Sequence, residues 1–202
     1  MTENEKIINE YRGVKYKICV SGTADTTHVD EDAFQMATEL GAEIVRQGGA
    51  LIDGATTGFP YWAAKGAKMA GGIVIGLSPA VDEKDHLTRY KLPIDFHDLI
   101  IYTGFNYSGR NLLLTRSSDA VVFGAGRMGT INEFTIAFED QKPMGILEGS
   151  WETDELMREI IEKSHRADEM KDKIVYSSNP KELIEKLIKV IDKYKGESKF
   201  VL

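Results

Sequence analysis

Short apolar runs alternate with longer segments in which apolar residues recur at helical spacing, along almost the whole chain. The short runs predict strands, and most are too continuously apolar to show alternation, which is typical of strands covered on both faces; they are residues 17–21, 50–53, 72–77, 98–102, 120–123, 144–147 and 173–176. The longer segments predict helices at residues 30–47, 58–70, 108–117, 130–141, 153–163 and 180–195. This order predicts an α/β protein, a doubly wound and mainly parallel sheet of about seven strands with helices on both faces.

The pattern predicts one domain over residues 15–202, preceded by an N-terminal arm or extra helix at residues 1–14. Asn179 before Pro180 predicts an N-cap followed by proline at the first helical position. Residues 78–97 form the longest irregular segment, and loops of that length are often lids or binding loops, with disorder as the alternative. The charged stretch 148–173 is most simply a solvated helical face.

Composition narrows the class of protein. A single cysteine, Cys19, argues against a disulfide framework and a thiolate zinc site, and the four histidines show no metal-ligand spacing, so we expect no metal and interpret the histidines as surface or loop residues. The chain begins without a signal-peptide pattern and lacks an apolar stretch that would span a membrane, so we expect a cytoplasmic protein with no membrane partner. A net charge of −7 disfavours extended nucleic-acid binding and permits a small, locally bound anion.

In open parallel sheets, ligands bind beyond the carboxyl ends of the strands. Four loops at those ends are rich in glycine and hydroxyl residues, which allow backbone N–H groups to approach an anion: residues 21–24, 53–58, 104–111 and 124–133. The first strand is not followed by G-x-G-x-x-G and no P-loop motif occurs, so a mononucleotide or sugar phosphate, without a separate cofactor, fits best. We therefore predict phosphate or ligand contacts from Ser21, Gly22, Gly54, Thr57, Gly58, Gly126, Arg127, Gly129 and Thr130.

Thr130 and Glu133 allow two interpretations. A threonine followed three residues later by glutamate before an apolar run is typical of a capping box, which would give both residues a purely structural role. The preceding Gly126 and Gly129 favour a phosphate site, because a cap needs no such glycine pair. Glu133 would then lie one turn inside the helix, beside a sugar attached to that phosphate.

Arg110 is the second unusual residue. If Ser108 caps the following helix, Arg110 falls in its first turn, where the macrodipole disfavours a cation, and a nearby anion would explain it. The alternative is an exposed arginine paired with a surface carboxylate. Arg116, six residues on, would point well away from Arg110 on a helix.

These residues resemble the Lonely Guy (LOG) family, also called lysine decarboxylase-like proteins. Gly126, Gly129, Thr130 and Glu133 match its P-G-G-x-G-T-x-x-E signature, and Arg110 matches its essential arginine. Gly54 and Gly58 match part of an earlier glycine-rich loop of the family, and the resemblance covers residues 17–147. The chain departs from the signature at Ala125 and Arg127, which replace its proline and its second glycine. Asn111 after the arginine is similar to the branch that includes molybdenum-cofactor carriers.

The resemblance implies a Rossmann-like homodimer that hydrolyses a nucleoside 5′-monophosphate to free base and ribose 5-phosphate. It implies that Gly129 and Thr130 hold the phosphate, Glu133 engages the ribose and assists the attacking water, and Arg110 supports charge at the reacting centre. The alternatives are a non-catalytic carrier or sensor of a nucleotide-like or molybdenum-cofactor-like ligand, favoured by Arg127 and Asn111, and a scaffold in which Thr130 and Glu133 only cap a helix.

Overall fold

The computed structural model describes residues 14–25, 27 and 29–197, so the predicted arm lies almost entirely outside the described residues. Its core is a seven-stranded, all-parallel sheet in the order β4-β3-β2-β1-β5-β6-β7. The strands are β1 (Tyr16–Ser21), β2 (Gly49–Asp53), β3 (Val74–Ser78), β4 (Leu99–Tyr102), β5 (Ala120–Phe123), β6 (Met144–Leu147) and β7 (Ile174–Ser177). The predicted α/β sheet is confirmed, and its strand order reverses direction between β1 and β5.

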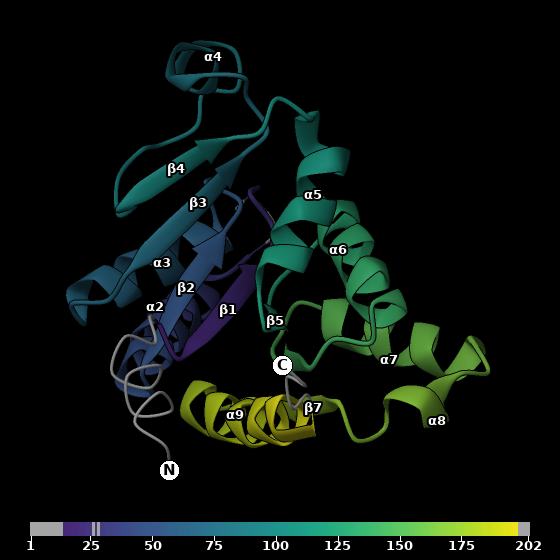
Figure 1. Ribbon diagram of the computed structural model, residues 1–202. Helices are drawn as coiled ribbons and strands as arrows, with labels where there is room; N and C mark the ends of the chain where they lie inside the picture. The colour runs from purple at the N-terminus through teal and green to yellow at the C-terminus, as the bar shows by residue number, and fades with distance from the viewer. Residues whose placement is uncertain (1–13, 26, 28, 198–202) are drawn as a thin grey trace, which may run out of the picture.

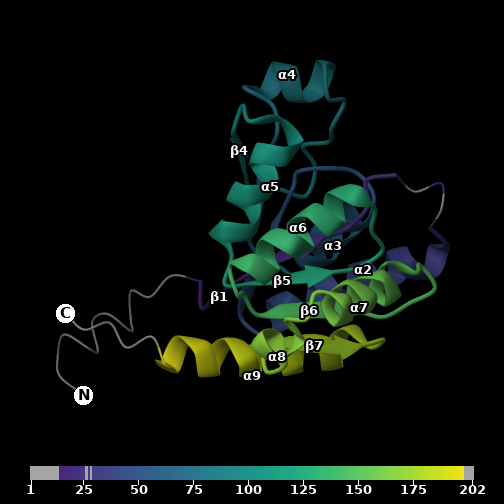
Figure 2. The same cartoon turned by 90° about the vertical axis from the view of Figure 1, so that its right-hand side faces the viewer.

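Helices cover both faces of the sheet (Figures 1 and 2). They are α2 (Glu31–Arg46), α3 (Phe59–Met69), α4 (Glu83–Thr88), α5 (Asn106–Ser117), α6 (Met128–Glu139), α7 (Thr153–Lys163), α8 (Ala167–Met170) and α9 (Pro180–Glu197). Apolar side chains of α2, α3 and α9 form one core with one face of the sheet, and those of α5, α6, α7 and α8 form a second core with the other face. Burial on both sides explains why the strands are apolar throughout.

Several local predictions can be compared with the structure. Asn179 caps α9 as predicted, since its Oδ1 accepts from the backbone N–H of Glu182 at 3.0 Å. Residues 78–97 are not wholly irregular, because Asp82 caps the short helix α4 there. The charged stretch 148–173 likewise contains two helices, α7 and α8, rather than one. Among the described residues, no helix is long and apolar enough to cross a membrane.

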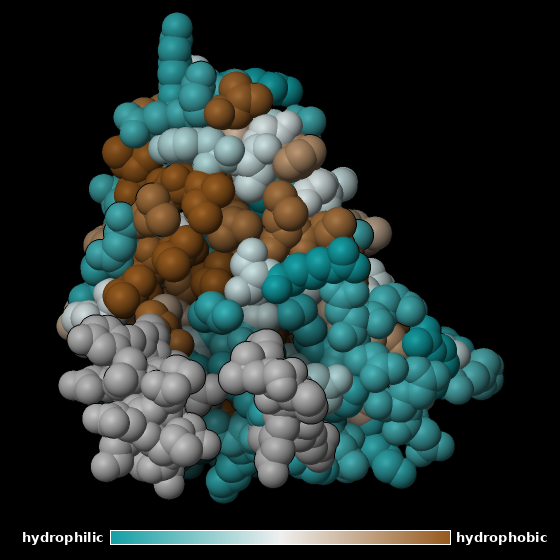
Figure 3. All heavy atoms as spheres, in the orientation of Figure 1, coloured by the Kyte–Doolittle hydropathy of each residue, from teal (hydrophilic) through white to brown (hydrophobic). Residues whose placement is uncertain are grey.

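The sheet leaves part of one face without a helix. Figure 3, drawn in the orientation of Figure 1, shows apolar side chains gathered over β3, β4 and α5. The large apolar residues exposed there include Leu99 and Ile101 of β4 and Leu112 and Leu113 of α5. We refer to these four residues as the β4–α5 face.

Candidate functional site

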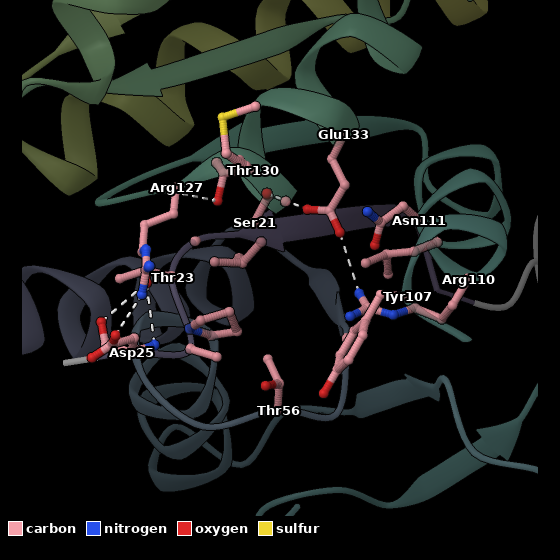
Figure 4. Close-up of a pocket in the computed structure, with 18 residues that line it drawn as sticks. Ser21, Thr23, Asp25, Thr56, Tyr107, Arg110, Asn111, Arg127, Thr130 and Glu133 are labelled. Atoms are coloured by element: carbon pink, nitrogen blue, oxygen red, sulfur yellow. Dashed lines mark hydrogen bonds and ion pairs between the residues drawn. The ribbon is translucent and has the colours of Figure 1, made fainter. Parts of the chain in front are cut away.

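A cavity of about 560 Å³ opens at the carboxyl ends of β1, β2 and β5. Its walls come from the loops after these strands and from the N-terminal halves of α5 and α6, several of whose side chains Figure 4 shows. The position beside the β1–β5 reversal is the one that open parallel sheets use for ligands. The lining residues include Ser21, Gly22, Thr23, Asp25, Gly54, Thr56, Tyr107, Arg110, Asn111, Arg127, Gly129, Thr130 and Glu133.

Most of the predicted site residues line this cavity, and three do not. Thr57 is exposed, and its hydroxyl donates to the carbonyl of Ala24 at 2.9 Å; the neighbouring Thr56 lines the cavity instead. Gly58 has a positive φ of 75° and begins α3, so its place is in the turn. Gly126 faces a neighbouring cavity. The sequence marked the correct loops but not which side of each loop faces the cavity.

Arg110 and Glu133 meet inside the cavity. Arg110 Nη1 lies 3.2 Å from Glu133 Oε1, and their side chains are only 7% and 8% exposed. The Ser21 hydroxyl donates to the other carboxylate oxygen of Glu133. The Asn111 amide, in the orientation that satisfies its neighbours, donates to Glu133 Oε1 at 2.8 Å. The alternative of an exposed Arg110 with a surface partner is therefore wrong.

Burial is the largest influence on the Glu133 carboxyl, and it raises its pKa. The Arg110 guanidinium and the Ser21 hydroxyl oppose this rise, while the nearby Asp53 adds to it. Arg110 also passes close to Gly54, where a Cβ would lie 2.3 Å from Nη1, so glycine is needed to seat the guanidinium. Among the described residues, Arg110 Nε is buried without a hydrogen-bond partner. The site thus holds a cation with an unused donor beside a carboxyl of raised pKa.

The two flanking helices begin earlier than the sequence suggested. Helix α6 begins at Met128, so Thr130 is its third residue and its hydroxyl accepts from the backbone N–H of Arg127 at 3.4 Å. Glu133 turns into the cavity and makes no capping bond, so the interpretation of Thr130 and Glu133 as a capping box is wrong. Helix α5 begins at Asn106, which places Arg110 in the second turn, and Ser108 is not its cap.

Arg127 lies at the opposite side of the cavity from Arg110. Its guanidinium pairs with the carboxylate of Asp25, which joins the β1–α2 loop to the start of α6 (Figure 4). Both side chains are partly exposed, at 59% and 39%. Such a pair is worth about 0–1 kcal/mol, so an anionic ligand can displace it at little cost.

The interpretation of the histidines as surface or loop residues is wrong for His86, which lies in α4, whereas His97 lies in the loop before β4. His86 is fully buried, with Nδ1 2.8 Å from the Ser78 hydroxyl and Nε2 2.9 Å from the Pro93 carbonyl. The side chains of His97 and Asp53 are also fully buried and lie 2.8 Å apart. His165 is exposed, and His28 lies outside the described residues.

Both ring nitrogens of His97 face acceptors, because Nδ1 lies 2.8 Å from the Asp95 carbonyl. Burial lowers the pKa of His97, but the charge and hydrogen bond of Asp53 outweigh it and raise the pKa overall. Asp53 stands next to Gly54, so this pair supports the loop on which Arg110 rests.

The sequence did not single out Thr23, Asp25, Thr56 or Tyr107, all of which line the cavity. Three of them belong to the predicted loops, and Asp25 directly follows one. No sequence spacing distinguishes them, as cavity-lining residues, from the other residues of those loops. Tyr107 lies against the Arg110 guanidinium, 5.8 Å from ring centroid to Cζ. Within the described part of the chain, no group of three or more histidine, cysteine, aspartate or glutamate side chains is placed to hold a metal ion.

Two comparisons of sequence support the resemblance. The model of the SLOG cluster4 family matches residues 15–184. An uncharacterised protein of Archaeoglobus fulgidus is 34% identical over 131 residues, which are 65% of this chain and 81% of that protein.

Solved structures with the same fold include two proteins whose names state a ligand. The molybdenum cofactor carrier protein of Chlamydomonas reinhardtii is 26% identical with a TM-score of 0.69, over 88% of this chain and 99% of that one. The molybdenum cofactor binding protein of Rippkaea orientalis is 26% identical with a TM-score of 0.65, over 89% and 95% of the two chains. With its doubly wound sheet, its LOG-like signature and a family match over most of its length, the chain belongs to the SLOG cluster4 family.

Proposed function

We propose that the protein is a nucleoside 5′-monophosphate phosphoribohydrolase, which releases free base and ribose 5-phosphate. The observation that supports this most is the convergence of the buried Arg110 and Glu133 on one cavity beside Gly129 and Thr130. The cavity of about 560 Å³ falls within the range of about 300–1,000 Å³ that small-molecule sites occupy.

The phosphate would bind at the start of α6, where the backbone N–H groups near Gly129 and the Thr130 hydroxyl face the cavity. This anchor places the sugar toward Glu133, which lies one turn further along the helix. The binding energy of the phosphate then helps to position the N-glycosidic bond, which is remote from the phosphate.

Cleavage of an N-glycosidic bond passes through a state with positive charge on the sugar. The Glu133 carboxylate would stabilise that charge and accept a proton from the attacking water, and its raised pKa suits a group that must take up a proton. Arg110, Ser21 and Asn111 hold the carboxylate in place. Arg110 would turn its unused Nε donor to the ribose or to an oxygen that gains charge. No separate cofactor is needed for this reaction.

The test is incubation with a panel of nucleoside 5′-monophosphates and detection of free base by chromatography. Glu133→Gln keeps the size of the side chain and removes the base, so we expect loss of base release with ligand binding retained. Arg116→Gln is the matched control, because Arg116 lies on α5 like Arg110 but pairs with Asp140 outside the cavity. If the folded protein releases no base from any monophosphate, the proposal is wrong.

We also propose a homodimer formed through the β4–α5 face. Leu99 and Ile101 are 55% and 47% exposed on the edge strand, and Figure 3 shows an apolar surface over the region of β3, β4 and α5. Tyr107, the second residue of α5, lines the cavity and is also 48% exposed, so a partner seated on this face would lie beside the site. Leu99→Lys with Ile101→Lys should halve the mass measured by light scattering; an unchanged mass would refute this interface.

A non-catalytic carrier is the second candidate function, favoured by Asn111 and by the two molybdenum-cofactor proteins of similar fold. Its ligand would be a nucleotide-like or molybdenum-cofactor-like phosphate ester bound in the same cavity. The Arg127–Asp25 pair at the cavity mouth fits retention of a ligand. A carrier predicts thermal stabilisation by ligand without turnover, and measurable base release that Glu133→Gln abolishes would exclude it.

A further inference from the structure

A second cavity, of about 340 Å³, adjoins the first one. The two cavities share Thr23, Asp25 and Arg127 in their walls. The Arg127–Asp25 ion pair lies at this boundary, and both of its side chains are partly exposed.

The second cavity lies across the point where the strand order reverses. The β1–α2 and β5–α6 loops border both cavities; from there the first cavity extends toward the β2–α3 loop and α5, and the second toward Ser150, Trp151 and Glu152 of the β6–α7 loop. A groove that crosses this crevice is where doubly wound sheets bind dinucleotides.

A glycine pattern stands at the boundary between the cavities. Gly124, Gly126 and Gly129 have the spacing G-x-G-x-x-G from the end of β5 into the first turn of α6, so the motif that is missing after the first strand occurs after the fifth. Together with β6 this makes a strand–helix–strand unit with the motif in its first turn. In such units the pyrophosphate of a dinucleotide lies at the start of the helix, and an acidic residue about 20 residues further on binds a ribose.

The acidic side chains expected for that ribose follow β6. Glu148 comes directly after the strand but pairs with Arg158. Glu152, four residues on, lines the second cavity, where its φ of 57° places it in the left-handed region. Its carboxylate is therefore the acidic group that follows β6 and lines this cavity.

Trp151 supplies an aromatic wall to the second cavity. Its ring lies over Gly149, where a Cβ would come within 2.4 Å of the indole, so the loop is built to hold the ring there. Its Nε1 is buried and has no hydrogen-bond partner within the described part of the chain. A ring with an unused donor beside a carboxylate suits a nucleoside, which offers a flat base and sugar hydroxyls.

The charged groups at the boundary between the two cavities indicate which part of a ligand would bind there. Arg127 stands at the boundary together with the N–H groups at the start of α6, and Arg110, more than nine-tenths buried, faces the first cavity with an unpartnered Nε. These groups favour anionic oxygens at the boundary. We propose that the site accepts a pyrophosphate-bridged dinucleotide, one nucleoside in each cavity, with Arg127 moving from Asp25 to the pyrophosphate.

This inference rests on the proposed nucleotide site but not on hydrolysis, because it concerns binding alone. The test measures dissociation constants by calorimetry for the four symmetric 5′,5′-pyrophosphate-bridged dinucleosides and, for each base, the matching nucleoside mono- and diphosphate. The diphosphate controls for the second phosphate group, since it lacks only the second nucleoside. We expect at least one dinucleotide to bind tenfold or more tightly than its matching diphosphate.

Ser150→Trp fills the second cavity from an exposed loop position, and Ser150 does not line the first cavity. It should remove the tighter binding of the dinucleotide and leave the affinity for the monophosphate unchanged. If Ser150→Trp does not fold, Trp151→Ala is the substitute test, because it removes the aromatic wall and should reduce the difference in affinity between dinucleotide and diphosphate. Equal affinity for dinucleotide and diphosphate, or no binding of either, overturns the inference. Base release from monophosphates without a preference for dinucleotides would support the proposed hydrolysis and contradict the binding inference. A preference for dinucleotides without base release would support the binding inference and contradict the proposed hydrolysis.

Discussion

Replacing Arg110 by methionine should show how strongly the site depends on its buried charge pair. In the folded protein, the Glu133 carboxylate is 8% exposed and its cationic partner lies 3.2 Å away. Methionine fills similar volume but leaves that carboxylate buried without its counter-charge. Removing one partner of a buried pair costs about 3–5 kcal/mol, which is a large part of the 5–15 kcal/mol that holds a typical domain folded.

The loss of stability should depend on pH. Burial raises the pKa of the Glu133 carboxyl above its ordinary value of 4.5, and Arg110 limits the rise. In Arg110→Met the pKa rises further, so the folded variant keeps a proton that the unfolded chain has lost. Its free energy of unfolding should therefore fall as pH rises from about 4.5 through the raised pKa, so the deficit relative to the natural protein is small at acid pH and full above that window.

The assay is urea unfolding of both proteins at pH 5 and pH 8, with two controls. Arg116→Met removes a cation of the same helix from a surface pair whose side chains are 59% and 23% exposed, and should cost only about 0–1 kcal/mol. Arg110→Met combined with Glu133→Gln removes both charges and should recover much of the stability. The reasoning is refuted if Arg110→Met costs no more than Arg116→Met at pH 8, or if the double variant recovers nothing.

Three further predictions follow from the same contacts. Ser21→Ala removes a hydrogen bond that lowers the pKa of Glu133, so the acid limb of the pH–rate profile for base release should move to higher pH; a shift to lower pH would contradict this assignment. Folding brings His97 beside the Asp53 carboxylate, and its pKa is raised in the folded protein. The stability that the charged imidazole contributes is therefore complete below the ordinary pKa of 6.5 and is lost as the pH rises through the raised pKa. His97→Gln should therefore lower the melting temperature more at pH 6 than at pH 9, and an equal loss at both would argue against a charged imidazole. Gly54→Ala forces the Arg110 guanidinium aside, so calorimetry should show at least tenfold weaker nucleotide binding, whereas unchanged affinity would mean that Arg110 does not contact the ligand.

The architecture, and the loops that border the candidate site, could be predicted from the sequence alone. Continuous apolar strands and helical spacing depend on local covalent geometry and on burial, so their alternation is enough to predict a doubly wound sheet. Because parallel strands all end at one edge of a sheet, the loops after them had to lie near one another. The resemblance to the LOG family then placed Arg110 and Glu133 in one site before their contact was seen.

Only the tertiary structure decided which atoms of those loops meet. A helix start shifts by a residue or two with its surroundings, so α5 and α6 begin at Asn106 and Met128 rather than at the predicted positions, and Thr130 and Glu133 do not form a cap. The burial of His97 against Asp53 depends on chain segments about 40 residues apart, which no local pattern encodes. Whether one cavity or two lies beside Arg127 depends on how the β5–α6 and β6–α7 loops pack, because a cavity is a property of the assembled fold.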